Sequence, residues 1–162
     1  MTYHTGIIIG RFQPFHLGHL YLFEKAFEKV DRVIVAVGSK DVGGKDNPYG
    51  FDKVKGMIRT VLENEDWQDR VIQILGVPDF PDDEVWRRYI EERVGPFDVV
   101  VSNNDWVTGI YKNSNKPVIE IPFYRRDIYE GKKIRKMMES GEKWEERLPE
   151  YIVNNISRSS TT

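Results

Sequence analysis

The sequence predicts a single α/β domain, doubly wound around a mostly parallel five-stranded sheet and followed by C-terminal helices. Five short apolar runs rich in β-branched residues are continuous rather than alternating, which is typical of strands buried on both faces of a parallel sheet. Segments with helical spacing separate these runs, and such alternation with right-handed crossovers gives a Rossmann-like sheet. The length of 162 residues suits one domain.

The predicted strands are residues 7–9, 33–37, 71–75, 99–101 and 118–121. In a doubly wound sheet, ligands bind beyond the carboxyl ends of the strands. A functional site is therefore expected in the loops that follow the strands. These loops are residues 10–16, 38–50, 78–83, 102–105 and 122–131.

Four helices are predicted from apolar residues spaced three or four apart. Asp82 or Asp83 is expected to cap the third helix, and Gly141 is expected to end the fourth. The low-complexity segment 157–162 is expected to be a disordered tail, which leaves 1–156 as the domain. The four apolar stripes are Leu20, Phe23, Phe27 and Val30; Val54, Met57, Ile58, Val61 and Leu62; Trp86, Tyr89, Ile90 and Val94; and Ile134, Met137 and Met138.

The composition narrows the class of protein. There is no cysteine, so disulfide scaffolds, cysteine nucleophiles and thiolate metal sites are excluded. The 24 Lys+Arg and 26 Asp+Glu residues give a net charge of -2, without the basic excess of a nucleic-acid-binding protein. No apolar run approaches the ~20 residues of a membrane span, and the N-terminus does not resemble a signal peptide. A cytoplasmic protein without nucleic-acid or membrane partners is expected.

The loop after the first strand holds the most informative residues, Gly10 to His19. His16 and His19 are three residues apart, so both project from one face at the start of a helix. A helix N-terminus attracts phosphate, and the guanidinium of Arg11 adds a fork of donors. Gly10 is expected to provide a tight turn, and Gly18 to let a ligand approach the backbone. The alternative is that the histidines are surface residues or half of a metal site.

The string Gly10-Arg11-Phe12-Gln13-Pro14, followed by His16-x-Gly18-His19, resembles the signature of the nucleotidyltransferases with a His-x-Gly-His motif. Within that group the chain is similar to the archaeal-type nicotinamide-nucleotide adenylyltransferases from about residue 7 to about residue 156. The resemblance implies adenylyl transfer from ATP to the phosphate of nicotinamide mononucleotide (NMN). The products would be NAD and pyrophosphate, formed by direct in-line displacement.

Later segments carry the resemblance further: Asn47-Pro48, Val77-Pro78-Asp79, Trp86, Ser102 to Asn104, Arg126 and Ile134-Arg135. The resemblance implies Mg²⁺ that arrives with ATP, and no metal ligands from the chain. It implies catalytic roles for His16, His19, Arg11 and Arg135. It implies ATP contacts for Gly10, Phe12, Gln13, Gly18, Arg126, Lys132 and Ile134, and NMN contacts for Asn47, Asp79, Trp86 and Asn104.

The chain departs from the family at two places. Hydroxyl residues normally precede the Ile-Arg pair, whereas this chain has Tyr129-Glu130-Gly131-Lys132-Lys133, and Asp52-Lys53 replaces an acid-arginine pair. Trp86 lies on an apolar helical stripe, and without the resemblance this pattern favours a core residue over a ligand-binding one. Two other functions therefore stay open: a sister transferase that uses a flavin or pantetheine phosphate, and a nucleotide-binding regulator without turnover. The choice between NMN and its nicotinic acid analogue, and homo-oligomer formation, also stay open.

Overall fold

The structure is a computed structural model that describes residues 3–159. Five strands form one all-parallel sheet in the order β3-β2-β1-β4-β5, which confirms the predicted fold class. Because β2 and β3 lie on one side of β1 and β4 and β5 on the other, the winding reverses between β1 and β4. The strands are β1 (Tyr3–Gly10), β2 (Val30–Val37), β3 (Val71–Gly76), β4 (Val99–Ser102) and β5 (Val118–Glu120).

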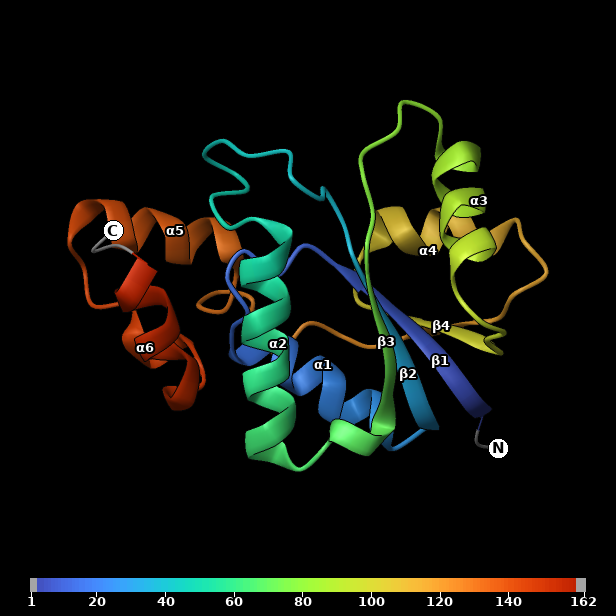
Figure 1. Ribbon diagram of the computed structural model, residues 1–162, viewed down its shortest axis with the longest axis horizontal. Coiled ribbons are helices and arrows are strands. Elements are labelled where there is room, and N and C mark those ends of the chain that lie inside the picture. The colour runs from blue at the N-terminus through green and yellow to red at the C-terminus, as the bar shows by residue number, and fades with distance from the viewer. Residues whose placement is uncertain (1–2, 160–162) are drawn as a thin grey trace.

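Helices cover both faces of the sheet, so two hydrophobic clusters form (Figure 1). The larger cluster joins α1 (Leu17–Phe27) and α2 (Phe51–Glu65) to one face, and the smaller cluster joins α3 (Asp83–Arg93) and α4 (Asp105–Lys112) to the other. Side chains of successive strand residues alternate between the two clusters, as Ile7 and Ile8 do. No helix in the described part of the chain is long and apolar enough to cross a bilayer.

The C-terminal part adds α5 (Gly131–Ser140) and α6 (Glu150–Ser159) beside α2. Three hydrogen bonds hold α6 against α2. The Lys53 ammonium donates to the carbonyl of Asn155 at 2.6 Å, the Asn155 amide donates to the Thr60 hydroxyl at 3.0 Å, and the Tyr151 hydroxyl donates to Glu65 at 2.8 Å. Residues 157–159 continue α6, although the sequence assigned them to the tail, and residues 160–162 lie outside the described part. Two short 3-10 turns, Gln68–Arg70 and Glu145–Arg147, complete the elements.

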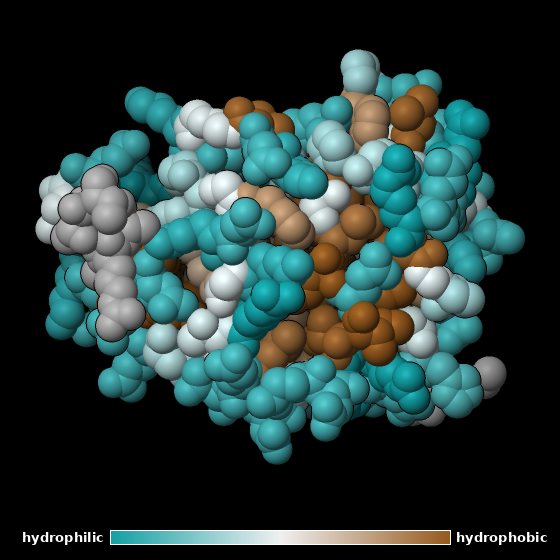
Figure 2. Space-filling view, in the orientation of Figure 1, coloured by the Kyte–Doolittle hydropathy of each residue, from teal (hydrophilic) through white to brown (hydrophobic). Residues whose placement is uncertain are grey.

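The structure corrects three details of the predicted elements. The β3 run is an edge strand, so it is not buried on both faces, and Ile72 is 49% exposed. Figure 2 shows the resulting apolar area over β3. Val30 begins β2 instead of ending the first helical stripe, because α1 stops at Phe27. No helix was predicted at α4, since an eight-residue helix offers only two turns of pattern.

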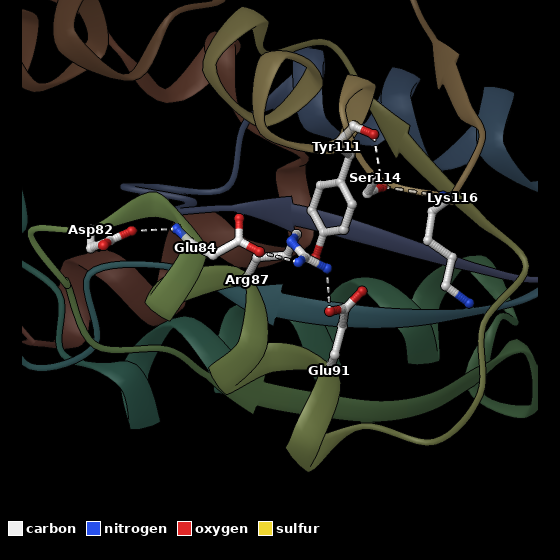
Figure 3. A network of polar contacts seen from close by, with 7 residues as sticks. All are labelled: Asp82, Glu84, Arg87, Glu91, Tyr111, Ser114 and Lys116. Atoms are coloured by element: carbon white, nitrogen blue, oxygen red, sulfur yellow. Dashed lines mark hydrogen bonds and ion pairs between the residues drawn. The ribbon is translucent and has the colours of Figure 1, made fainter.

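Figure 3 shows the polar contacts of α3 and of the segment at the end of α4. Arg87 binds Glu84 and, at 2.7 Å, Glu91 on its own helix, and the phenol of Tyr111 points toward its guanidinium. Asp82 caps α3 by accepting from the Glu84 backbone, as one of the two predicted caps. The hydroxyl of Tyr111 is buried without a hydrogen-bond partner among the described residues, so α3 and α4 are joined by the apolar packing of the small cluster.

Candidate active site

Two cavities open at the carboxyl ends of β1 and β4, where the winding of the sheet reverses. The main cleft, of about 440 Å³, lies between the loop after β1, the loop after β5 and the start of α5. The side cavity, of about 300 Å³, lies between the ends of β1 and β2 and the helices α3 and α4. Ile9, Gly10, Arg11 and Asn104 line both cavities, so the two spaces meet at these residues. This is the position at which a doubly wound sheet binds ligands.

The two histidines are fixed by the helix end that they cap. His16 is the N-cap of α1, and its Nδ1 accepts from the backbone of Gly18 at 3.0 Å. The backbone N–H of His16 donates in turn to Nδ1 of His19 at 3.1 Å. The imidazole rings stack with centroids 3.7 Å apart, and both line the main cleft. The sequence therefore predicted correctly that both residues occupy one face at the helix start.

The electrostatics of the pair follow from burial. Burial lowers the pKa of His16 to about 3. Burial, and then the nearby His16, lower the pKa of His19 well below its usual value. Both rings are therefore neutral at pH 7, and because each Nδ1 accepts a hydrogen bond, the proton lies on Nε2. The cleft thus contains two neutral N–H donors in fixed positions.

The two glycines of the motif make room for side chains, which corrects their expected roles. A Cβ on Gly18 would lie 2.8 Å from Cε1 of His16, so the space is filled by the imidazole and not by a ligand. A Cβ on Gly10 would lie 3.1 Å from the ring of Phe12. Gly10 ends β1 without a positive φ, and the turn itself falls at Phe12, whose φ is 52°. The sequence shows that these positions are glycine, but it does not show which side chain fills the space beside each one.

Four contacts hold the walls of the cleft together. The side-chain amide of Gln13 donates to the carbonyl of Tyr49 at 2.7 Å and accepts from its N–H at 2.9 Å. The guanidinium of Arg135 donates to the carbonyl of Gln13 at 2.7 Å and lies 3.6 Å from Asp46. Burial, followed by the charge of Arg11, lowers the pKa of Arg135 from its usual value. The start of α5 thus faces the loop after β1, as expected from the sheet.

The basic residues at the start of α5 divide into two groups. Lys133 donates to the carbonyls of Arg126 and Asp127 and lies 3.6 Å from Glu130, so it is committed to the loop. Lys132 is exposed, lines the main cleft and forms no ion pair with any residue that the structure describes. Glu130 also lines the cleft, but its carboxylate is 4.0 Å from Arg126 as well as near Lys133. Its charge is therefore partly compensated.

The side cavity combines aromatic rings with a carboxylate. Trp86 and Asp79 line it, as does Ser39, whose hydroxyl donates to Asp79 at 2.8 Å. Trp86 is only 3% exposed and packs in the small cluster, as the core interpretation predicts, and it also lines the side cavity. Asn104 lines the cavity, and its Oδ1 accepts from the first turn of α4.

The structure brings most predicted site residues together and leaves two aside. Eleven of them line the main cleft or both cavities. Among these, Phe12 is only 1% exposed, and the side-chain amide of Gln13 is hydrogen-bonded to the backbone of Tyr49. Ile134 is completely buried in the large cluster, because the apolar side of α5 faces the core. Asn47 lines neither cavity and is 8% exposed. The sequence-predicted residues that line the cavities are Gly10, Arg11, Phe12, Gln13, His16, Gly18, His19, Asn104, Arg126, Lys132 and Arg135, with Asp79 and Trp86 in the side cavity alone.

Several lining residues were not predicted. Phe123 and Tyr124 follow β5 and are 43% and 45% exposed in the main cleft. The ring of Tyr124 stacks with the rings of Tyr21 and Tyr129, at centroid distances of 4.7 Å and 5.7 Å. Trp106 lines the side cavity from α4. Their positions after β4 and β5 were a usable signal, since the sheet places these loops at the site.

No group of three or more His, Asp or Glu side chains that could hold a metal ion occurs in residues 3–159. The two carboxylates of the main cleft, Asp46 and Glu130, already lie near Arg135 and Lys133, respectively. A divalent cation held by phosphate oxygens of a nucleotide, rather than by a cage of protein ligands, fits this donor set.

Comparisons with known proteins agree with this geometry. The profile of the Cytidylyltransferase-like family matches residues 7–159. The nicotinamide-nucleotide adenylyltransferase of Thermococcus kodakarensis is 32% identical over 152 residues, which are 93% of this chain and 81% of that protein. The protein of the same name from Archaeoglobus fulgidus is 33% identical, over 91% of this chain and 87% of that one.

Two solved structures share the fold. A bifunctional NMN adenylyltransferase/ADP ribose pyrophosphatase from Francisella tularensis, complexed with AMP and Mn ion, has a TM-score of 0.83 and 22% identity. The match covers 99% of this chain and 50% of that one, so this chain spans about half of the bifunctional protein. TmcAL from Thermotoga maritima, bound with alpha-thio ATP, has a TM-score of 0.74 and 14% identity, over 98% and 56% of the two chains.

Proposed function

Because the chain belongs to the Cytidylyltransferase-like family and, within it, to the nicotinamide-nucleotide adenylyltransferases, we propose that it joins ATP and NMN to give NAD and pyrophosphate. The observation that carries the proposal is the meeting of two unlike cavities at Gly10, Arg11 and Asn104. The main cleft is rich in phosphate-binding donors, and the side cavity is lined by tryptophans. Each substrate has a space suited to its chemistry, and the two reacting phosphates meet at the junction.

The reaction is a direct displacement at the α-phosphorus of ATP. An oxygen of the NMN phosphate forms the new P–O bond, the bond to the bridging oxygen between the α- and β-phosphates breaks, and pyrophosphate leaves with that electron pair. The step needs no protein nucleophile, and catalysis depends on alignment and on neutralisation of charge. The fixed junction of the cavities supports such alignment.

His16 and His19 donate hydrogen bonds from Nε2 to phosphate oxygens of ATP. Their Nδ1 atoms are held by backbone N–H groups, so the rings do not reorganise when charge develops. His19 is the donor to the α-phosphate in this account. Because both imidazoles are neutral, the protein does not have to bury a charged side chain at these two positions in order to bind the phosphate oxygens.

The leaving pyrophosphate is held by Arg11, Arg126 and Lys132, which line the main cleft. Arg135 contributes positive charge and holds the loop after β1 in place through the carbonyl of Gln13. Mg²⁺ would be held chiefly by the phosphate oxygens of ATP and not by a cage of side chains, and it would supply further neutralisation of phosphate charge beside these cationic residues. The Lys132 ammonium takes the part that hydroxyl residues have in the family.

In the side cavity, Asp79, Trp86 and Asn104 form the surroundings of the nicotinamide ribonucleotide. Ile134 acts through the fold, because it anchors α5 in the large cluster. Asn47 is buried, and its Oδ1 has no hydrogen-bond partner among the described residues.

The proposal is tested by pyrophosphate release from ATP with a panel of acceptors: NMN, flavin mononucleotide and 4′-phosphopantetheine, repeated with CTP. Turnover with NMN and ATP supports the proposal. Turnover only with another phosphate or with CTP assigns the chain to a sister activity. ATP binding by calorimetry without any turnover assigns it to a nucleotide-binding regulator.

A further inference from the structure

Trp106 is the more exposed of the two tryptophans that line the side cavity. It lies in the first turn of α4 and lines the side cavity, with 50% of the residue exposed. Large apolar side chains on a protein surface are unremarkable singly, but a half-exposed tryptophan in the wall of a cavity offers a flat, free face.

Trp86 offers much less of its ring to a ligand. It is 3% exposed, it packs in the small cluster, and the ring of Trp106 lies against it at 4.7 Å with an interplanar angle of 56°. A substrate ring cannot insert between two centroids that are already at contact distance. The free stacking surface of the side cavity therefore belongs to Trp106, and Trp86 supports it from behind.

The backbone of Trp106 is held in place while its ring stays accessible. Oδ1 of Asn104 accepts from the N–H of Trp106 at 2.8 Å and of Val107 at 3.3 Å, and Ser102 donates to the carbonyl of Asn104. A fixed aromatic ring binds a flat ligand with little loss of conformational freedom.

The cavity also carries a negatively charged side chain. Asp79 lines it, and Ser39 orients that carboxylate by a hydrogen bond of 2.8 Å. The only cation among the lining residues described is Arg11, which is shared with the main cleft and thus lies toward the phosphates. An aromatic face beside a carboxylate recognises a flat cation.

On the basis of the proposed function, we propose that Trp106 is the stacking surface for the nicotinamide ring and that Trp106 with Asp79 selects the oxidised, positively charged pyridinium. The uncharged dihydropyridine ring of reduced NMN lacks the cation–π attraction and the attraction to Asp79. The negatively charged carboxylate of the nicotinic acid analogue is repelled by Asp79. Trp106 is therefore a specificity-determining residue of the adenylyl transfer.

The test compares Trp106→Leu and Trp106→Phe with the parent, using KM and kcat for NMN and for reduced NMN at saturating ATP. Trp106→Leu should raise the KM for NMN by roughly 5- to 150-fold, the range found for loss of one stacked base. It should raise the KM for reduced NMN less, and Trp106→Phe should restore most of the affinity. The KM for ATP and the melting temperature should change little, because the residue is half exposed.

Ile72→Ala serves as the control, because it removes a similarly exposed apolar side chain from the far edge of the sheet. It should leave all four kinetic constants unchanged. An unchanged KM for NMN in Trp106→Leu overturns the stacking role, and an equal loss for both forms of NMN overturns the selection by charge. Calorimetry of the parent with NMN alone separates these results from failure of the proposed function, in which the parent itself does not bind NMN.

Discussion

Replacement of Gly18 by alanine should move the His16 ring while leaving the stability of the fold nearly unchanged. The new Cβ would lie 2.8 Å from Cε1 and 2.9 Å from Nδ1 of His16, and 3.3 Å from Cβ of Tyr129. Restoring ordinary contact at 3.4 Å requires the imidazole to shift by about 0.6 Å. Because His19 stacks on that ring at 3.7 Å, the shift is passed to both donors.

The two effects on stability nearly cancel. Alanine in place of glycine within a helix gains at most about 1 kcal/mol, and a weakened N-cap costs about 1 kcal/mol. The free energy of unfolding of Gly18→Ala should therefore stay within about 1 kcal/mol of the parent. A misplacement approaching 1 Å in an active site costs up to about 10²-fold, so kcat for NAD synthesis should fall by about 10- to 100-fold.

The assays are pyrophosphate release at saturating ATP and NMN, and urea unfolding of the same preparations. Gly56→Ala is the matched control: this glycine lies within α2, and a Cβ there meets nothing within 4 Å. It should stabilise the protein slightly and keep the parental kcat. A parental kcat in Gly18→Ala would refute the inference that the glycine exists to seat the imidazole.

Further predictions concern the donors of the main cleft. His19→Ala should lower kcat by roughly 10²–10³ while the Kd for ATP changes less, since the contact strengthens in the transition state; a parental kcat at saturating ATP contradicts this. Arg135→Lys should lower kcat/KM by about 10-fold, because an ammonium cannot replace a guanidinium that spans two partners; full activity refutes it. Lys132→Ala should weaken ATP binding about 2- to 5-fold at low salt and less at high salt, whereas Lys136→Ala should not; calorimetry at two salt concentrations checks both. Burial lowers the pKa of His16 from about 6.5 in the unfolded chain to about 3 in the folded protein, so its contribution to stability is complete above pH 6.5 and is lost as the pH falls toward 3. His16→Asn, which keeps an N-cap, should reduce the slope of the unfolding free energy against pH by about 1.4 kcal/mol per pH unit between pH 6 and 4. Urea unfolding measures this slope, and an unchanged slope contradicts the prediction.

The sheet and the location of the site could be predicted because both follow from local patterns. Continuous β-branched runs such as 33–37 are unambiguous, and the carboxyl ends of parallel strands must share one edge. The His-x-Gly-His spacing places both rings at the start of α1 whatever the distant contacts are.

Other features depend on neighbours that the sequence does not specify. The roles of Gly10 and Gly18 are set by the rings of Phe12 and His16, which fill the space beside them. Ile134 is adjacent to a residue of the site, but the helical rotation of 100° turns its side chain into the core. The exposure of Trp106 follows from the packing of α4 against α3 and has no signal in its own segment.

The central claim is that the NMN phosphate attacks the α-phosphorus directly, at the junction of the two cavities. The stereochemical course tests this most directly, using one diastereomer of adenosine 5′-O-(1-thiotriphosphate) with NMN and determining the configuration at phosphorus in the thio-NAD formed. A single in-line displacement predicts inversion of configuration. Retention would require two displacements through a covalent adenylyl-enzyme and would contradict the account.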